Sequence, residues 1–247
     1  MNRRTFLNTA AAAAATTVLP AHAATTGIRA VAFDGLALFD PRPIFALAEE
    51  FFPGRGNALA TAWRVRIFEY SWLRTLTRSY ESFMRIAEDA LVFALAQEKL
   101  VASDAQRKQL VAGFMNLRTW PDVAPVLRRL KAAGLRLAPL THFSLPMLEK
   151  GIANSGLEGL FDHLLSADLV QAYKPDPRAY QMAVDRFGLS PNQIAFVAFG
   201  GWDAAGAKSF GFPTIWVNRL NAPTEQLGIA PDAVAASFDA LPGFVGV

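Results

Sequence analysis

The chain has 247 residues, 52% of them hydrophobic, which is enough for one substantial core with one inserted subdomain. Its 24 basic and 21 acidic side chains give a formal net charge of +3, too small to predict a nucleic-acid partner. Cysteine is absent, which excludes disulfide bonds, thiolate metal sites and a cysteine nucleophile, and which suits an oxidising compartment.

Residues 1–23 have the features of a signal peptide. Arg3 and Arg4 precede an alanine-rich apolar run, and Ala21-His22-Ala23 matches a cleavage site. Paired arginines are typical of the twin-arginine export route, which predicts a periplasmic protein. The alternative, an N-terminal helix, is disfavoured because the run is featureless and too short to span a bilayer. The mature chain would keep 22 basic and 21 acidic side chains, and none of its segments predicts stable membrane association.

Short β-rich runs alternate with longer helical runs in the rest of the chain, except in its second quarter. The β-rich runs lack strict apolar-polar alternation, which is typical of parallel strands covered on both faces. The predicted strands are Ile28–Phe33, Leu135–Leu140, His163–Ser166, Ile194–Phe199 and Thr214–Val217. The predicted helices, each stopping at a glycine, are Val123–Ala133, Leu145–Ser155, Pro177–Phe187 and Ala204–Phe210. This pattern predicts an α/β fold with a Rossmann-like, doubly wound parallel sheet, whose active site lies at the carboxyl ends of the strands.

Residues 43–121 are helical throughout in their pattern. The predicted helices are Ile44–Phe52, Asn57–Thr77, Tyr80–Glu98 and Ser103–Leu117. We interpret this stretch as a helical cap, inserted after the first strand of a core formed by residues 24–42 and 122–247. Ser103 followed by Gln106 fits a capping box, which marks a helix start.

Polar residues follow several predicted strands. Asp34, Thr141-His142 and Asp203 come after three of them, and Lys174 lies in the loop after a fourth. Loops at strand ends can converge on one pocket. Each residue also has a purely structural explanation: Asp34 as a turn or cap residue, the lysine as a solvated side chain, and Asp203 as a helix N-cap.

Four spaced motifs, taken in order, carry a family resemblance. They are Ala32-Phe33-Asp34 with Leu38-Phe39-Asp40, Trp63-Arg64 with Phe68-Glu69-Tyr70-Ser71-Trp72-Leu73-Arg74, Tyr173-Lys174-Pro175-Asp176-Pro177-Arg178-Ala179-Tyr180, and Gly201-Trp202-Asp203-Ala204-Ala205-Gly206-Ala207. Over nearly all of the mature sequence the chain resembles the haloacid dehalogenase-like superfamily, specifically the type II (S)-2-haloacid dehalogenases.

The resemblance implies hydrolytic dehalogenation of short 2-haloalkanoic acids without metal or cofactor. Asp34 would attack C2, expel a halide ion and form an ester that water hydrolyses. Lys174 would keep Asp34 ionised, and Asp203 would hold the lysine or its water. Leu36 supports metal independence, because the Mg-dependent phosphatases of the superfamily carry a second aspartate at this position.

The resemblance also implies contacts to substrate and halide. Arg64 would bind the departing halide and share a helix face with Phe68, although it could instead lie over a ring or pair with a surface carboxylate. Thr141 would bind the substrate carboxylate. His142 replaces an asparagine and leaves three roles open: carboxylate binding, general base catalysis of ester hydrolysis, or packing. The aromatic residues implied at or beside the pocket, for which core packing is the alternative, are Phe68, Phe83, Tyr180 and Trp202.

The chain departs from the family pattern near the nucleophile. The first motif is one residue shorter than usual, and Ala37 stands where a threonine hydroxyl would orient the carboxylate. Ala198 and Gly200 stand where a serine and an asparagine are expected. These losses predict an altered substrate, slower turnover or none.

Other functions are compatible with parts of the sequence. A Mg-dependent phosphatase is disfavoured by Leu36 and by Asp203 as the single carboxylate of the last motif. A serine hydrolase is disfavoured because no G-x-S-x-G occurs. A periplasmic binding protein with lost turnover would not need Asp34, Arg64 and Lys174 together. No feature specifies a scaffold's partner, and a homodimer is compatible with the resemblance.

Overall fold

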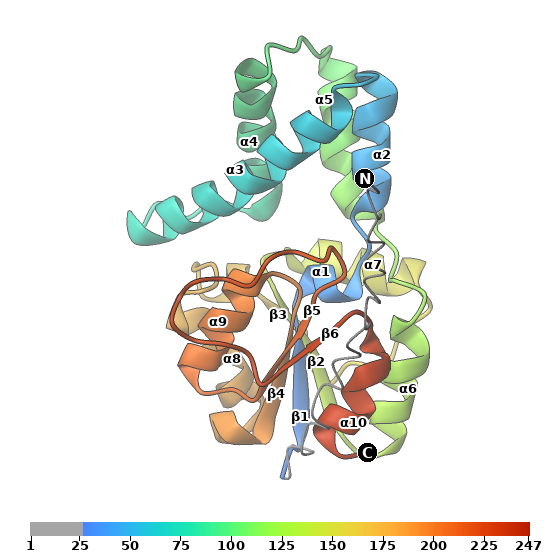
Figure 1. The fold of residues 1–247 in the computed structure, drawn as a ribbon, viewed down its shortest axis with the longest axis vertical. Helices are drawn as coiled ribbons and strands as arrows, with labels where there is room; N and C mark the ends of the chain where they lie inside the picture. Colours follow the sequence, from blue (N-terminus) through green and yellow to red (C-terminus); the bar gives the residue numbers. More distant parts are fainter. Residues whose placement is uncertain (1–26) are drawn as a thin grey trace, which may run out of the picture.

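A computed structural model describes residues 27–247, so the predicted signal peptide lies outside the described residues. The described residues form a six-stranded sheet in the order β3-β2-β1-β4-β5-β6, in which every neighbouring pair is parallel (Figure 1). The doubly wound α/β fold predicted from the sequence is confirmed. The strands are β1 (Ala30–Phe33), β2 (Arg136–Thr141), β3 (Leu165–Ser166), β4 (Ile194–Ala198), β5 (Thr214–Val217) and β6 (Ala233–Ala235).

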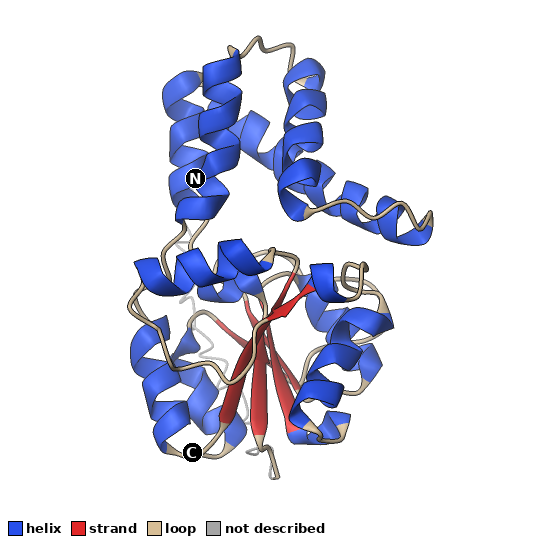
Figure 2. Ribbon diagram, turned by 180° about the vertical axis from the view of Figure 1, so that it is seen from behind, coloured by secondary structure: helices blue, strands red, loops and turns tan. Residues whose placement is uncertain are grey.

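Helices cover both faces of the sheet, as Figure 2 shows. The helices of the core are α6 (Val123–Ala132), α7 (Leu145–Asn154), α8 (Pro177–Phe187), α9 (Gly201–Phe210) and α10 (Leu241–Val245). The helices α8 and α9 end at Gly188 and Gly211, both with positive φ, which a residue without Cβ adopts without strain. The glycines in the sequence therefore marked these helix ends correctly.

The central strands are apolar throughout because both of their faces are buried. In β1, Val31 and Phe33 pack in one hydrophobic cluster with α6 and α10, whereas Ala30 and Ala32 pack in a second cluster with α8 and α9. The second cluster also contains the large ring of Phe196, from the neighbouring β4. Small and large side chains on adjacent strands thus fill the space between sheet and helices.

A helical layer stands above the carboxyl ends of the strands (Figure 1). It consists of α2 (Arg42–Phe51), α3 (Gly56–Leu76), α4 (Phe83–Gln97), α5 (Asp104–Ala112) and the 3-10 helix η1 (Gly113–Asn116). We call this layer the cap. The capping box predicted at the start of α5 is present, since Ser103 Oγ accepts from the N–H of Gln106 and Gln106 Oε1 accepts from the N–H of Ser103.

The sequence pattern did not predict α1 (Gly35–Leu38), β6 or α10. Each has five residues or fewer, which is too short to show a full hydrophobic period. The same holds for the 3-10 helices η2 (Ala167–Leu169), η3 (Pro191–Gln193) and η4 (Phe238–Ala240). Within residues 27–247, no helix combines the length and the hydropathy needed to cross a membrane.

Replacing Ser103 by alanine should lower the free energy of unfolding by about 1 kcal/mol, because the N–H of Gln106 loses its acceptor. Chemical denaturation followed by circular dichroism measures this change. The control is Ser103→Thr, which keeps the hydroxyl and should stay near the wild-type stability. Equal stability of the alanine and threonine variants would show that the capping bond contributes nothing.

Candidate active site

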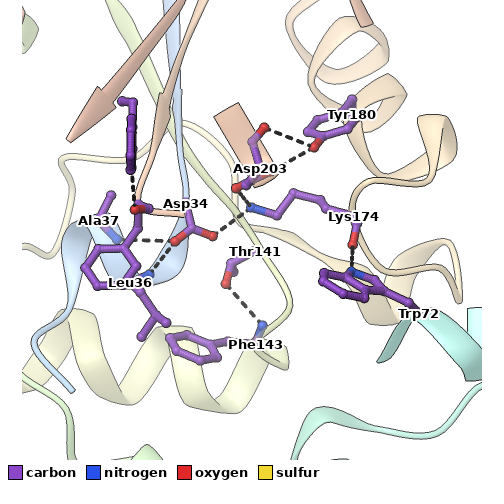
Figure 3. Close-up of polar contacts among 11 residues, drawn as sticks. Asp34, Leu36, Ala37, Trp72, Thr141, Phe143, Lys174, Tyr180 and Asp203 are labelled. Atoms are coloured by element: carbon purple, nitrogen blue, oxygen red, sulfur yellow. Dashed lines mark hydrogen bonds and ion pairs between the residues drawn. The ribbon is translucent and has the colours of Figure 1, made fainter. Parts of the chain in front are cut away.

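Asp34 lies directly after β1, at the carboxyl edge of the sheet. Its N–H donates to the carbonyl of Val197 in β4 at 2.9 Å. Its carboxylate caps α1, because Oδ1 accepts from the N–H groups of Leu36 at 2.8 Å and Ala37 at 3.3 Å (Figure 3). The cap role that the sequence left open is therefore present. Two main-chain N–H groups supply the orientation that a hydroxyl at position 37 would otherwise give.

A buried ammonium group contacts the second oxygen of Asp34. Lys174, which is 1% exposed, donates from Nζ to Asp34 Oδ2 at 2.7 Å and to Asp203 Oδ2 at 2.5 Å (Figure 3). Burial by itself lowers the pKa of Lys174, but the negative charges of Asp203 and Asp34 outweigh burial and raise this pKa above its ordinary value. The lysine therefore stays charged.

Asp203 is fully buried and holds the lysine from the opposite side. Its Oδ1 accepts from the hydroxyl of Tyr180 at 2.8 Å. Burial raises the pKa of Asp203 to about 6, against the opposing effect of the Lys174 charge. The interpretation of Asp203 as a helix N-cap is wrong. The helix α9 begins at Gly201 with Gly200 as its N-cap, and the N–H of Asp203 itself donates to the Gly200 carbonyl.

Residues at the end of α3 and in the loop after it hold the main chain around the lysine. Trp72 Nε1–H donates to the carbonyl of Lys174 at 3.1 Å (Figure 3). The hydroxyl of Thr75 accepts from the N–H of Tyr173 at 3.0 Å, and the Tyr173 hydroxyl donates to the carbonyl of Glu81 at 2.6 Å. The cap therefore positions Lys174 as well as covering the sheet edge.

An apolar cavity adjoins Asp34 beneath the cap, and we call it the first cavity. Arg64 and Phe68, one turn apart on α3, both line it, as their spacing predicted. Within the described residues Arg64 makes no hydrogen bond or ion pair, so its guanidinium is available to an anion. The other lining residues are Leu36, Pro41, Phe45, Trp63, Ile67, Phe83, Phe114, Thr141, His142 and Phe143.

Thr141 reaches the first cavity from the end of β2. Its Oγ1 accepts from the N–H of Phe143 at 3.1 Å, which leaves the hydroxyl hydrogen available to a ligand. The neighbouring chain at Gly35 passes so close that an added Cβ would lie 2.3 Å from Thr141 Oγ1. Only glycine fits at this position without displacing the threonine.

His142 lines the same cavity and is 5% exposed. Neither of its ring nitrogens has a hydrogen-bond partner within residues 27–247. Burial first, and then the positive charge of Lys174, lower the pKa of His142 well below 6.5. The ring is therefore neutral in the working pH range of most enzymes.

A second cavity also reaches Asp34 and shares Leu36, Arg64 and Phe68 with the first. Its walls are more polar, because Glu69, Asn218 and Glu225 line it. Trp202 completes the wall, with its ring 5.1 Å from that of Phe68 and 5.3 Å from that of Trp72 between centroids.

Tyr180 and Phe83, which the resemblance implied at or beside the pocket, differ in how they contribute to it. Tyr180 lines neither cavity beside Asp34, because its hydroxyl is bonded to Asp203, so it supports the lysine and does not face substrate. Phe83 lines the first cavity, yet its ring also packs edge-on against Phe114 and Phe143, so pocket lining and core packing coexist.

Some lining residues received no role from the sequence. Trp63 and Ile67 lie one turn apart on α3, and this apolar spacing beside Arg64 could have identified them. Trp72 stood within a quoted motif but its bond to the loop of Lys174 was not predicted. Phe114 comes from a distant segment, and no local pattern marks it.

Comparison with known proteins matches residues 6–211 to a family model described as haloacid dehalogenase-like hydrolase. The chain belongs to this family. It is 40% identical over 215 residues to the (S)-2-haloacid dehalogenase of Pseudomonas sp. (strain YL), covering 87% of this chain and 93% of that relative.

Two solved structures of haloacid dehalogenase-like hydrolases are similar to the whole described fold. The L-2-haloacid dehalogenase RSc1362 is 40% identical with a TM-score of 0.86, covering 90% of this chain and 100% of that one. The L-2-haloacid dehalogenase from Xanthobacter autotrophicus with chloropropionic acid covalently bound is 31% identical with a TM-score of 0.80, covering 89% of this chain and 98% of that one.

The activity of this hydrolase should fall below pH 6, about tenfold for each pH unit, because protonated Asp203 no longer holds the Lys174 ammonium. On the alkaline side the activity should not decline until the pH exceeds 10.5, because the pKa of Lys174 is raised above that value. The pH profile of kcat/KM measures both limits.

The free energy of unfolding should also depend on the protonation of Asp203, but it should change with pH in the direction opposite to the activity. Between pH 3.8 and about 6 the folded protein binds more protons at Asp203 than the unfolded chain does, so this contribution to stability falls as pH rises. Asp203→Asn should remove both the acid limb and this slope. An acid limb near pH 6 that persists in this variant would assign it to another group.

Proposed function

We propose that this haloacid dehalogenase-like hydrolase removes halide from short 2-haloalkanoic acids by metal-independent hydrolysis. One observation carries the proposal: Lys174 Nζ lies 2.7 Å from Asp34 Oδ2, beside an apolar cavity in which Arg64 has no partner among the described residues. A carboxylate oxygen and an available cation in one apolar cavity suit the displacement of an anionic leaving group from carbon. The similarity to (S)-2-haloacid dehalogenases supports the same reaction.

The two oxygens of Asp34 have different neighbours and therefore different roles in the first step. Oδ1 is fixed by two N–H groups, and Oδ2 is bonded to the Lys174 ammonium. Oδ2 attacks C2 of the haloacid, and the electron pair of the carbon–halogen bond leaves with the halide toward Arg64. The apolar wall strips water from the halide and so strengthens its attraction to the guanidinium.

The second step hydrolyses the ester on Asp34. Water adds to Cγ, and Oδ1 becomes an oxyanion that the N–H groups of Leu36 and Ala37 stabilise. Collapse breaks the bond from Cγ to the ester oxygen and releases a 2-hydroxy acid. Thr141, with its hydroxyl hydrogen available, is placed to hold the substrate carboxylate through both steps.

Metal independence follows from the position of the Lys174 ammonium. It lies between the carboxylates of Asp34 and Asp203, at 2.7 and 2.5 Å, and supplies there the positive charge that a bridging divalent cation would bring. Leu36 adds an apolar side chain to the cavity beside the nucleophile, whereas Mg²⁺ prefers oxygen ligands. A Mg-dependent phosphatase is therefore the weaker candidate.

The mature protein should release chloride from (S)-2-chloropropionate, or bromide from bromoacetate, without added metal. Asp34→Asn should lower this rate by about four orders of magnitude or more, because the nucleophilic carboxylate is lost. In one turnover in water enriched in the heavy oxygen isotope, the label should enter Asp34 and not the product hydroxyl. Ion chromatography and peptide mass spectrometry measure the two effects.

The matched control for this experiment is Asp40→Asn, since Asp40 pairs with Arg42 at the surface and lines neither cavity. It should keep the wild-type rate, as should wild-type protein treated with EDTA. Mg-dependent release of phosphate from phosphomonoesters would establish the phosphatase instead. Capture of haloacid without halide release would establish a binding protein.

We further propose that residues 1–23 are a twin-arginine signal peptide and that the mature enzyme works in the periplasm, as the sequence pattern supports. Fractionation of cells that express the full chain should find the enzyme in the periplasm. Exchange of both Arg3 and Arg4 for lysine should retain it, uncleaved, in the cytoplasm, and unchanged export of that variant would contradict the route. A homodimer is proposed from the family resemblance alone.

A further inference from the structure

His142 is a buried titratable group that makes no well-aligned hydrogen bond within the described residues, although the main chain of Lys174 lies close enough to favour its protonated form slightly. Both ring nitrogens lack a hydrogen bond within the described residues, although the ring lines the first cavity together with Asp34. Three aromatic rings surround it, those of Tyr173, Trp202 and Phe68 at 4.7, 5.9 and 6.2 Å between centroids. Both nitrogens are buried without a hydrogen bond, which is costly, and a bond to a molecule in the cavity that the ring lines would relieve this cost.

The other polar groups around Asp34 cannot take a proton from water in this cavity. Arg64 carries only donors, and the hydroxyl of Thr141 is a very weak base that already accepts a hydrogen bond. Lys174 is an ammonium with no lone pair. Asp203 lines neither cavity, and both of its oxygens already accept hydrogen bonds.

We propose that His142 is the general base of the second step and removes a proton from the water that attacks the Asp34 ester. The inference rests on the proposed function, because it requires that ester. The sequence left base catalysis, carboxylate binding and packing open for His142, and the unpartnered ring together with the exclusion of its neighbours favours base catalysis.

The proton and electron transfers balance as follows. One ring nitrogen takes a proton from water while the water oxygen bonds to Cγ of Asp34. The bond from Cγ to the ester oxygen then breaks, its electron pair leaves with the alkoxide, and the alkoxide takes the proton back from His142. The regenerated carboxylic acid loses its proton to solvent, so the products are a 2-hydroxy acid, a halide ion and one proton.

The surroundings of His142 keep one ring nitrogen unprotonated, although they also make it a weaker base than a free imidazole. Since burial and the Lys174 charge keep the ring neutral, one nitrogen always has a lone pair. The imidazolium forms only while the adjacent oxyanion exists, so the two opposite charges appear and disappear together. General base catalysis of this kind contributes about 10²–10⁴-fold to a rate.

Glu69 and Glu225 both line the second cavity, which also reaches Asp34, and Glu69 is the competing base because Glu225 is exposed. Glu69 Oε2 is buried and pairs with Arg66 at 2.9 Å, while the side chain as a whole is 39% exposed. The same replacement of acid by amide, Glu69→Gln, therefore tests the alternative directly.

The experiment compares rapid-quench reactions of (S)-2-chloropropionate with the wild type, His142→Asn and Glu69→Gln. His142→Asn keeps a buried polar side chain but no base. It should release a burst of about one chloride per active site, then turn over 10²-fold or more slowly, while mass spectrometry finds the ester on the peptide that contains Asp34. Glu69→Gln should show neither the burst nor the accumulated ester.

A second variant distinguishes base catalysis from packing. His142→Ala should show the same accumulated ester, and added imidazole should speed its disappearance without changing the rate of the chloride burst. Thermal unfolding of both variants accompanies the kinetics. If His142→Asn does not fold, the imidazole response of His142→Ala decides.

The outcomes separate the two proposals. A wild-type protein that releases no halide overturns the proposed function. If the wild type turns over and His142→Asn changes KM without accumulating ester, His142 only binds substrate and the inference fails. Ester accumulation in Glu69→Gln, or a response to imidazole in the burst alone, overturns it as well.

Discussion

The active site depends on one buried ammonium group held between two carboxylates. Lys174 is enclosed by protein, and so is Asp203; breaking such a buried pair by removing one partner costs on the order of 3–5 kcal/mol. The parallel sheet makes this arrangement available, because β1 and β4 are neighbours and each delivers one acid at its carboxyl end. The lysine must then come from elsewhere, and it comes from the loop before α8.

The two oxygens of Asp34 and the two cavities beside it provide different chemical surroundings for the reaction. On Asp34, one oxygen lies among main-chain N–H groups and the other contacts the lysine, so the same carboxylate has a fixed side and a reactive side. Around it, the first cavity is apolar with Arg64, Thr141 and His142 as its exceptions, while the second is also lined by carboxylates and an amide.

The sequence predicted the sheet, the helix ends at glycine and the order of the motifs, because these follow from periodicity and residue type. It also brought Asp34, Lys174 and Asp203 together through strand-end reasoning, which needs only the topology. It could not predict that α9 starts before Asp203, since that depends on the Gly200 carbonyl accepting the hydrogen bond. Nor could it place Tyr180 behind the lysine or leave His142 unpartnered, because both depend on distant packing.

Trp72 bonds to Lys174, and Thr75 and Glu81 bond to Tyr173. The cap that covers the cavities therefore also supports the segment that carries the Lys174 ammonium. Asp34 therefore has its counterion Lys174 firmly in place only while the cap rests on the sheet. With the cap displaced, Lys174 would be held less firmly beside Asp34, and Asp34 would be a poorer nucleophile. The cap therefore couples the enclosure of a substrate to the readiness of the nucleophile.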